Sequence, residues 1–439
     1  MHRSFFYITL LTCSFYLNAC ASPQQNKQQK LTTSEISDPN NLPAPYATKS
    51  AHNFSKVIGW KDGETPIAPA GFVVTKFAEG LDNPRWIYQA ANGDIFIVET
   101  NTVLHGIKKF GASISRKIKT QNLGESANRI RLFRDKDKNG SYETASVFAE
   151  NLNQPLGMLI LNNHFYVANT DGLEIYDYKT GDTVLPLKGK RIVSLPAGGY
   201  NNHWTRNIIT NDAGTKIYIT VGSGSNNGEN GMDKEIRRAN ILEINPDGTG
   251  EKIYASGLRN PVGINFEPVT KMIWAAVNER DELGDDLVPD YATSVKPGGF
   301  YGWPYSYFGA NADPRMKNDP HTELVNKAIV PDVALGAHTA SLGLAFYTKN
   351  NFPQKYKGGM FIGQHGSWNR AQFSGYKVVF VPFANGKPSG KPEDFLTGFI
   401  ADQSKDEVHG RPVGVTVIND GSLLVADDAS KIVWRIKAK

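Results

Sequence analysis

The stretch NGDIFIVET, at residues 92–100, shows the pattern that recurs along this chain and indicates its fold. Asn92-Gly93 is typical of a hairpin turn, Asp94 to Glu99 predicts a β-strand, and Glu99-Thr100 ends the strand in polar residues. Six such runs are present, each leading from a turn through a strand into a polar or charged cluster. They begin at Asn83-Pro84, Gln154-Pro155, Asn202-His203, Asn260-Pro261, Ser341-Leu342 and Arg411-Pro412.

The six polar clusters predict where function lies. They are Glu99-Thr100, Asn169-Thr170-Asp171, Gly222 to Asn226, Asn278 to Asp281, Gln364 to Trp368 and Asp427-Asp428. Self-similarity at about 40 to 80 residues, with strands and no convincing amphipathic helix, is typical of a β-propeller. We therefore predict an all-β fold, a six-bladed β-propeller, in which equivalent strand ends converge on one mouth of a central channel. The strand at Ile432 to Ile436 should pair with the strand at Phe72 and close the structure without an open edge.

Composition narrows the functional classes. A radial β-structure can absorb 439 residues as one domain, and 42 glycines and 24 prolines suit many short strands and turns. The formal charge of +5 is mild and dispersed, with no long basic run, which argues against a nucleic-acid partner. The only cysteines are Cys13 and Cys20, which excludes a disulfide scaffold.

The N-terminus has the layout of a secretion signal. Arg3 precedes the apolar run from Phe5 to Leu17, and the run ends at Leu17-Asn18-Ala19-Cys20. This resembles the bacterial lipoprotein signal, so Cys20 is expected to become the lipidated first residue and to hold the protein at a membrane. Ala21 after the cysteine favours the outer membrane, on its periplasmic side. The alternative is a cleaved signal and a free periplasmic protein.

The domain prediction follows from these features. Residues 1–20 are the signal peptide, residues 21–65 a disordered tether rich in polar residues, and residues 66–439 the catalytic propeller.

Three stretches carry candidate chemistry. His203 stands where a repeat starts, so a neutral imidazole there can accept a proton from a substrate hydroxyl; the alternative is a packed structural histidine. The carboxylates of Asn278 to Asp286 suit a hard cation, or else form an acidic surface turn paired with Arg280. Residues 135–140 imitate the first half of a calcium loop, but its twelfth position is Ser146, which leaves an ordinary turn or a peripheral ion.

A second set of residues suits a planar polyanion. Guanidinium groups at the strand ends fit carboxylates, and tryptophans offer flat faces for a conjugated ring, although each taken singly also suits a core position. The set comprises Arg206, Arg259, Arg280, Arg370, Arg411, Trp204, Trp303 and Trp368.

Taken in chain order, these stretches resemble the glucose/sorbosone dehydrogenase group, propellers that use pyrroloquinoline quinone (PQQ) with calcium; the sorbosone dehydrogenase branch fits best. The resemblance covers most of the chain from about Asn83 to Arg435. The matching stretches are Asn202 to Arg206, Val221 to Asn226, Gly257 to Gly263, Asn278 to Asp286, Gly299 to Pro304, His365 to Arg370 and Gly410 to Gly414.

The resemblance implies roles for individual residues. His203 matches the base that removes the proton from a sugar hydroxyl while hydride passes to the quinone. Asn226 lies in the loop whose asparagine contacts the cofactor, and Arg411 matches an arginine that binds a cofactor carboxylate. His365, Trp368 and Arg370 lie in the segment that supplies further cofactor contacts. Asp281 and Glu282 occupy the positions whose backbone carbonyls hold calcium.

The chain also departs from the soluble glucose enzymes, which place arginine immediately before the cofactor-loop asparagine and a second basic side chain two residues before the Arg411 position. Here those places hold Ser225 and His409. The arginine that polarises the quinone oxygen is therefore unassigned, with Arg280 or Arg206 as substitutes, and glucose is not specified as substrate.

We therefore expect a quinoprotein dehydrogenase that acts on an aldose sugar or a related aldehyde. Since no CxxCH haem motif is present, electrons should leave to a separate acceptor. Two other functions stay open. One is a metal-dependent lactonase or hydrolase that uses the acidic cluster for its ion, and the other is a non-catalytic surface-binding propeller.

Overall fold

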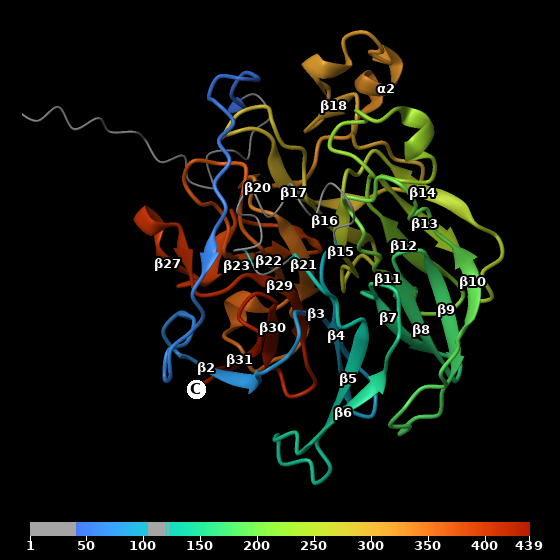
Figure 1. Ribbon diagram of the computed structural model, residues 1–439, viewed down its shortest axis with the longest axis vertical. Coiled ribbons are helices and arrows are strands. Elements are labelled where there is room, and N and C mark those ends of the chain that lie inside the picture. Colours follow the sequence, from blue (N-terminus) through green and yellow to red (C-terminus); the bar gives the residue numbers. More distant parts are fainter. Residues whose placement is uncertain (1–40, 104–119, 121–122) are drawn as a thin grey trace, which may run out of the picture. The chain divides into compact units, whose positions relative to one another are not determined.

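The computed structural model describes residues 41–103, residue 120 and residues 123–439 (Figure 1). The chain divides into two compact units, Met1–Leu31 and Thr32–Lys439, and all of the described residues lie in the second unit. The predicted signal peptide, Cys20 and residues 21–40 of the predicted tether lie outside the described residues. Within the described part, no helix is long and apolar enough to cross a membrane.

Six four-stranded antiparallel sheets form the framework of the described chain. In sheet order they contain β3 (Pro84–Gln89), β4 (Ile95–Glu99), β5 (Arg129–Arg134) and β6 (Thr144–Ala149); β7 (Met158–Leu161), β8 (His164–Asn169), β9 (Gly172–Asp177) and β10 (Lys190–Ser194); β11 (Ile208–Thr210), β12 (Ile217–Val221), β13 (Asn240–Ile244) and β14 (Lys252–Ser256); β15 (Pro261–Phe266), β16 (Ile273–Val277), β17 (Pro289–Val295) and β20 (Val333–Ala337); β21 (Ser341–Phe346), β22 (Met360–Gln364), β23 (Lys377–Val381) and β26 (Glu393–Leu396); β29 (Pro412–Val417), β30 (Leu423–Asp427), β31 (Ile432–Ala438) and β2 (Phe72–Ala78).

Smaller elements lie between these sheets. They are a sheet of β1 (Lys56–Val57), β28 (Glu407–Val408) and β27 (Ile400–Asp402), the hairpins β18 (Ser306–Tyr307) with β19 (Asn311–Ala312) and β24 (Phe383–Ala384) with β25 (Lys387–Pro388), and the short helix α2 (Thr322–Lys327). The prediction of an all-β class is confirmed for the described residues apart from such short helical turns.

The predicted closure of the chain is also confirmed. Strand β2 pairs with β31 from Phe72 opposite Ala438 to Ala78 opposite Val433, and Figure 1 draws blue β2 beside red β31. The strand at the start of the predicted propeller and the last strand of the chain thus share one sheet, in which β2 covers the edge of β31 and forms the outermost strand.

Residues at the starts of five of the six sheets meet in one apolar cluster. Leu156, Val262, Leu342 and Val413 are all buried and pack together, with Trp86 of β3 against them. In three of the four cases the next residue is a glycine on the same strand, and its small size permits close approach: a Cβ on Gly343 would lie 2.2 Å from the carbonyl oxygen of Val413. The starts of these strands, where the predicted site residues stand, are therefore held close together.

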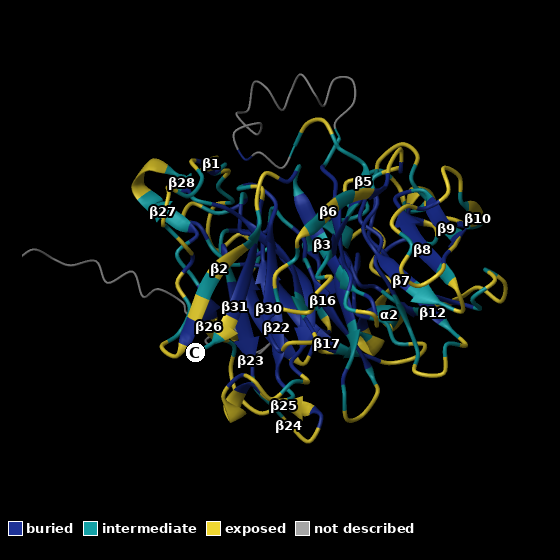
Figure 2. Ribbon diagram, turned by 90° about the horizontal axis from the view of Figure 1, so that it is seen from below, coloured by how far each residue is buried: buried dark blue, intermediate teal, exposed yellow. Residues whose placement is uncertain are grey.

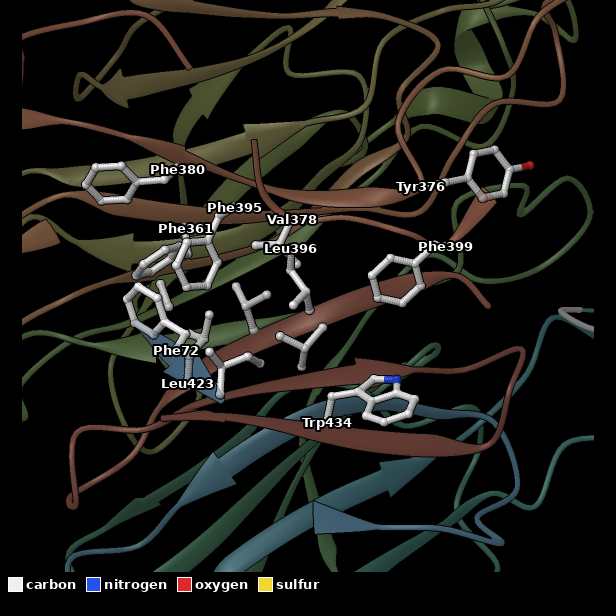
Figure 3. Packing of buried hydrophobic residues seen from close by; sticks show 14 of the residues in the cluster. Phe72, Phe361, Tyr376, Val378, Phe380, Phe395, Leu396, Phe399, Leu423 and Trp434 are labelled. Atoms are coloured by element: carbon white, nitrogen blue, oxygen red, sulfur yellow. The ribbon is translucent and has the colours of Figure 1, made fainter. Parts of the chain in front are cut away.

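Between neighbouring sheets the core is aromatic. Phe72, Phe361, Phe380 and Phe395 pack between the last two sheets, where Trp434 is fully buried (Figure 3). Figure 2 shows the middle strands buried along their length, with exposure gathered in turns and loops. This rigid frame positions the loops at the strand ends.

The segment before β2 differs from the prediction. Residues 41–65 were expected to belong to a disordered tether, but Phe54 stacks on Trp368 with ring centroids 5.8 Å apart, and Trp60 packs edge-on against Phe399 and Trp434. Its strand β1 pairs with β28. The prediction was based on the polar average composition of this region, which does not show that a few aromatic residues attach it to the fold.

Candidate active site

One part of the candidate site is a buried charge group around Asp428, which follows β30. Arg85 of β3 donates from Nη1 to Asp428 Oδ2 at 2.6 Å, and His365, after β22, places Nε2 2.9 Å from Asp428 Oδ1. Arg411, before β29, donates from Nε to the carbonyl of His365 at 3.0 Å and from Nη2 to that of Gly366 at 2.9 Å. Strand ends more than three hundred positions apart thus form one network, as the repeat predicted.

This Asp428 group has an excess of positive charge. Burial and the nearby Arg411 lower the pKa of His365 to about 4, so its imidazole is neutral at pH 7. Burial raises the pKa of Asp428, but His365 and Arg85 outweigh burial and lower it, so the carboxylate is charged. Two guanidinium groups therefore face one carboxylate, and Nε of Arg85 is buried without a hydrogen-bond partner in the described part of the chain. These donors fit a ligand that carries carboxylates.

The low pKa of His365 predicts an acid-sensitive fold. An unfolded histidine has a pKa near 6.5, so between pH 6.5 and about 4 the unfolded chain binds a proton that folded His365 does not. The free energy of unfolding is therefore unaffected above pH 6.5 and falls by on the order of 3 kcal/mol as the pH drops through this window. We expect urea unfolding at about pH 7 and about pH 4.5 to show a smaller acid loss in His365→Asn than in the wild type. Equal losses would contradict the assignment.

His203 lies in a second part of the site, which the first group contacts through Trp204. The guanidinium of Arg85 lies over the Trp204 ring, 5.4 Å from its centroid, and the indole Nε1 donates to Thr102 Oγ1 at 2.8 Å. His203, one residue earlier, packs against Gly222, where an added Cβ would lie 2.6 Å from the Cβ of His203. The glycine of the strand-end cluster is therefore required for the histidine to fit.

The hydrogen bond of His203 decides its tautomer. Nδ1 lies 2.8 Å from the carbonyl oxygen of Ser223, and because a carbonyl only accepts, Nδ1 carries the hydrogen and the Nε2 lone pair points elsewhere. Burial and, next, the charge of Arg259 lower the pKa of His203 well below its ordinary value. A half-buried, neutral imidazole with an available nitrogen has the properties of a general base.

The third part of the site is the loop after β16, held to the loop after β12. Asn226 accepts from the backbone N–H of Asp281 at 2.9 Å and donates to its carbonyl at 3.1 Å. Arg259 donates to Asn226 Oδ1 and to Asp281 Oδ2, and His338 Nδ1 lies 3.3 Å from Asp281 Oδ1. Burial raises the pKa of Asp281, but His338 and Arg259 outweigh it and lower the pKa.

Calcium does not fit Asp281 in this arrangement. Its carbonyl oxygen accepts from Asn226 and also from Arg315 Nη1 at 2.9 Å, so both lone pairs are used. Its carboxylate faces Arg259 and His338, and the carboxylate of Glu282 bonds to His52 at 2.8 Å. Calcium requires six to eight oxygen ligands, whereas these oxygens already accept hydrogen bonds from positively charged or polar groups.

The acidic run as a whole behaves the same way. Asp285 accepts from the backbone N–H groups of Ala51 and Ala371, and Asp286 pairs with Arg370 at 2.7 Å. This arrangement counts against a hydrolase that holds its metal on the run from Glu279 to Asp286.

A different set of carboxylates has the geometry of an ion site. Among the described residues the one group of three carboxylates able to share an ion is Asp135, Asp137 and Glu143. The calcium-loop pattern requires an acid at the position of Ser146, whereas the third carboxylate here is that of Glu143, three positions earlier. A pattern with fixed spacing therefore does not detect it.

Four predicted site residues have other surroundings. Arg280 is fully buried and pairs with Glu279 and Asp313 while donating to the carbonyls of Pro304 and Ser306, so its charge is used within the loop. It is therefore not available to polarise a quinone, and that prediction is wrong. The other three residues are Arg206, Trp368 and Arg370, and each has partners within the fold.

Arg206 is also buried, and it donates to the carbonyls of His203, Thr205 and Pro196. Burial and the nearby Arg238 lower its pKa to about 9. These contacts fix the backbone that carries His203, and Nε of Arg206 is buried without a hydrogen-bond partner among the described residues. Trp368 stacks on Phe54 of the N-terminal segment, and Arg370 donates to Asp286.

Comparison with known proteins now identifies the family. The model of a family described as "Domain of unknown function (DUF7133)" matches residues 68–434. The chain belongs to this family. An uncharacterized protein of Borreliella burgdorferi is 29% identical to the DUF7133 chain over 388 residues, which cover 84% of this chain and 89% of that protein.

Two further similarities concern one fungal enzyme. The pyrroloquinoline quinone-dependent pyranose dehydrogenase of Coprinopsis cinerea is 23% identical over 430 residues, which cover 84% of this chain. The match covers only 54% of that enzyme, so this chain spans about half of its length. The holo form of the pyranose dehydrogenase PQQ domain from the same organism has a TM-score of 0.68 at 20% identity, covering 88% of this chain and 100% of that one. This likeness shows a shared, propeller-like fold.

The structure adds residues that sequence reasoning missed. Arg85, Asp428 and His338 belong to the network but were not predicted as site residues. Arg85 follows Asn83-Pro84, and His338 precedes the run that starts at Ser341, as His203 precedes β11. Arg85 and His338 stand within a few residues of the start of a run, and Asp428 stands at the end of one. Inspection of every polar residue that flanks the six runs was therefore the signal that could have found them.

Proposed function

We propose that this chain is a quinoprotein oxidoreductase that oxidises a hydroxyl or aldehyde group of a small sugar with bound pyrroloquinoline quinone. The observation that carries the proposal is the environment of His203. It combines a fixed Nδ1–H tautomer, a lowered pKa and a position next to buried guanidinium groups. The names of the fungal relative and of its PQQ domain support the same chemistry.

The residues divide the work between a base and an anion site. When bound, the quinone accepts hydride from the substrate carbon. His203 Nε2 takes the hydroxyl proton, and the Ser223 carbonyl stabilises the imidazolium through Nδ1–H. Arg85 and Arg411 offer donors to carboxylates, with Asp428 fixing Arg85, and His365 stays neutral beside them. In the proposal the base and the anion site face one ligand across Trp204.

Several finer parts belong to the proposal. The six sheets act as six blades around one axis, the substrate is an aldose or sorbosone-like sugar, and electrons leave to a separate acceptor. Lipidation of Cys20 would hold the protein on the periplasmic side of the outer membrane. Calcium at Asp281 and Glu282 is left out of the proposal, because one of the two backbone carbonyls that the resemblance assigns to it, that of Asp281, is already engaged by Asn226 and Arg315.

The direct test is loading of the purified full chain. We expect PQQ to bind with a spectral change and to support dye reduction that depends on an added aldose or aldehyde. The same titration with EDTA, and again with added Ca²⁺, tests the metal. Because Asp281 offers no uncommitted oxygen, loading should not depend on Ca²⁺, and a strict requirement would contradict the arrangement at Asp281.

The alternatives give other outcomes in the same experiment. Metal-dependent cleavage of a lactone without quinone would favour a hydrolase. Absence of both PQQ binding and turnover would favour a binding protein and would refute the proposed function.

A further inference from the structure

The segment that was expected to be a tether lies against the candidate site. We define the N-terminal strap as residues 46–53. It lies along the loop from Asp281 to Asp285 and along the segment from Trp368 to Ala371, where the backbone N–H of Asn53 donates to the carbonyl of Trp368 at 2.8 Å. The loop carries Asp281, which belongs to the third part of the site, so the strap contacts the site there. The segment from Trp368 to Ala371 gives the strap a second anchor.

The strap holds the backbone of the loop through hydrogen bonds of both directions. The N–H of Gly284 donates to Ser50 Oγ at 2.9 Å, and the N–H of Asp285 donates to Thr48 Oγ1 at 2.8 Å. In the other direction, the N–H of Tyr46 donates to the carbonyl of Leu283 at 2.7 Å. Three consecutive loop residues are thus bound by strap atoms, although about 235 positions separate the two segments.

Ala51 is the centre of a three-way junction. Its N–H donates to Asp285 Oδ1 at 2.8 Å, and its carbonyl accepts from Asn369 Nδ2 at 3.1 Å. The other ends of these two side chains complete the junction: Asp285 Oδ2 accepts from the N–H of Ala371, and Asn369 Oδ1 accepts from the N–H of Glu282. Since Asn369 is fully buried, loss of the strap leaves its amide without one of its two partners.

The loop residues that the strap contacts directly follow Asp281 in the chain. Asp281 bonds to Asn226 through its own N–H and carbonyl, contacts His338 and Arg259, and lies close enough to His203 to act on its pKa. A displacement of residues 282–285 would therefore move Asp281 relative to the proposed base. An error of about 1 Å in such a site can cost a hundredfold in rate.

We propose that the N-terminal strap is a positioning element that fixes the loop from Asp281 to Asp285 beside His203 for ligand binding. The ligand part rests on the proposed function, and the effect on the loop does not. The strap is consequently part of the site and not a passive spacer.

The test removes only two hydroxyl acceptors. Thr48→Val with Ser50→Ala deletes the partners of the Gly284 and Asp285 N–H groups and preserves the strap backbone. The matched control exchanges the hydroxyl residues, Thr48→Ser with Ser50→Thr, and retains both acceptors. Circular dichroism and thermal melting verify that both full-length variants are folded.

Hydrogen–deuterium exchange resolved to single residues gives the first result. We expect exchange at Gly284 and Asp285 to accelerate about tenfold in the deletion variant and not in the control, the effect of losing about 1.4 kcal/mol of local stability. Exchange at the Asp281 N–H should accelerate as well, although neither substituted residue contacts it. Unchanged exchange at Asp281 would overturn the positioning role.

PQQ titration gives the second result. We expect affinity to fall about tenfold in the deletion variant and to be restored in the control. Faster exchange with unchanged PQQ affinity would show that the loop does not bind the ligand and would also overturn the proposal. If the wild type binds no PQQ, the proposed function fails, and exchange at Asp281 still decides whether the strap positions the loop.

Discussion

Replacing His203 by alanine should lower turnover of the PQQ-loaded protein by about 10² to 10⁴ while leaving PQQ binding nearly unchanged. The imidazole supplies the proton acceptor, whereas the anion-binding donors lie on Arg85 and Arg411. Steady-state kinetics at saturating quinone, together with a PQQ titration, separates the two effects.

His203→Gln removes the base with less loss of volume and should give a similar fall in turnover. His164→Gln, on β8 and paired at 3.5 Å with Asp177, is the control and should be active. Full turnover in a loaded His203 variant would refute the base assignment and would direct attention to His365.

The pH profile tests the same residue independently. A general base must be neutral, so the rate falls as the pH drops through the pKa of the folded protein. Because burial and Arg259 lower the pKa of His203 well below 6.5, kcat/KM of the wild type should stay flat from neutral pH down past pH 6.5. An acid limb centred at 6.5 or higher would indicate an ordinary, solvated histidine or a different base.

Replacing Asp428 by alanine should be the most destabilising single change in the site. It leaves the buried guanidinium of Arg85 without its carboxylate and removes the acceptor of His365 Nε2. Loss of one partner of a buried ion pair costs about 3–5 kcal/mol. Urea unfolding at neutral pH measures the change, and the PQQ affinity of the surviving folded protein should also be lower.

A surface carboxylate provides the comparison. Asp177 pairs with His164 while its side chain is 97% exposed, so Asp177→Ala should change stability little. Asp428→Asn provides a second comparison, because it keeps an oxygen acceptor but loses the charge, and its stability should lie between those of Asp428→Ala and the wild type. Similar unfolding free energies for Asp428→Ala and Asp177→Ala would contradict the buried charge group.

Turn residues and alternating apolar residues in the sequence were sufficient to predict the strands and the pairing of β2 with β31. Strands β3, β15, β21 and β29 begin at or one residue from the predicted turns. A proline or a polar turn residue followed by a run of apolar residues favours a turn that leads into a strand. The same repeat placed His203, Asn226, His365 and Arg411 at equivalent strand ends, which meet because the first strands pack together. The repeat therefore predicted contacts between residues far apart in the sequence, which a single motif cannot predict.

The sequence could not determine which charges pair with one another. Arg280 and Arg411 look alike in the chain, yet Arg280 is neutralised by Glu279 and Asp313, whereas Arg411 stands beside Arg85 with a single carboxylate between them. The sequence likewise predicts Asp281 as a cation ligand, whereas in the structure its carbonyl oxygen accepts hydrogen bonds from Asn226 and Arg315. Residues 41–65 read as a tether because their composition does not reveal the loop they cover. The sequence by itself thus determined the strands and the end of the sheets at which polar residues gather, because both depend on residues that are neighbours in the chain. Only the tertiary structure decided the ion pairs and the strap contacts, because each of these depends on a partner that the fold brings close.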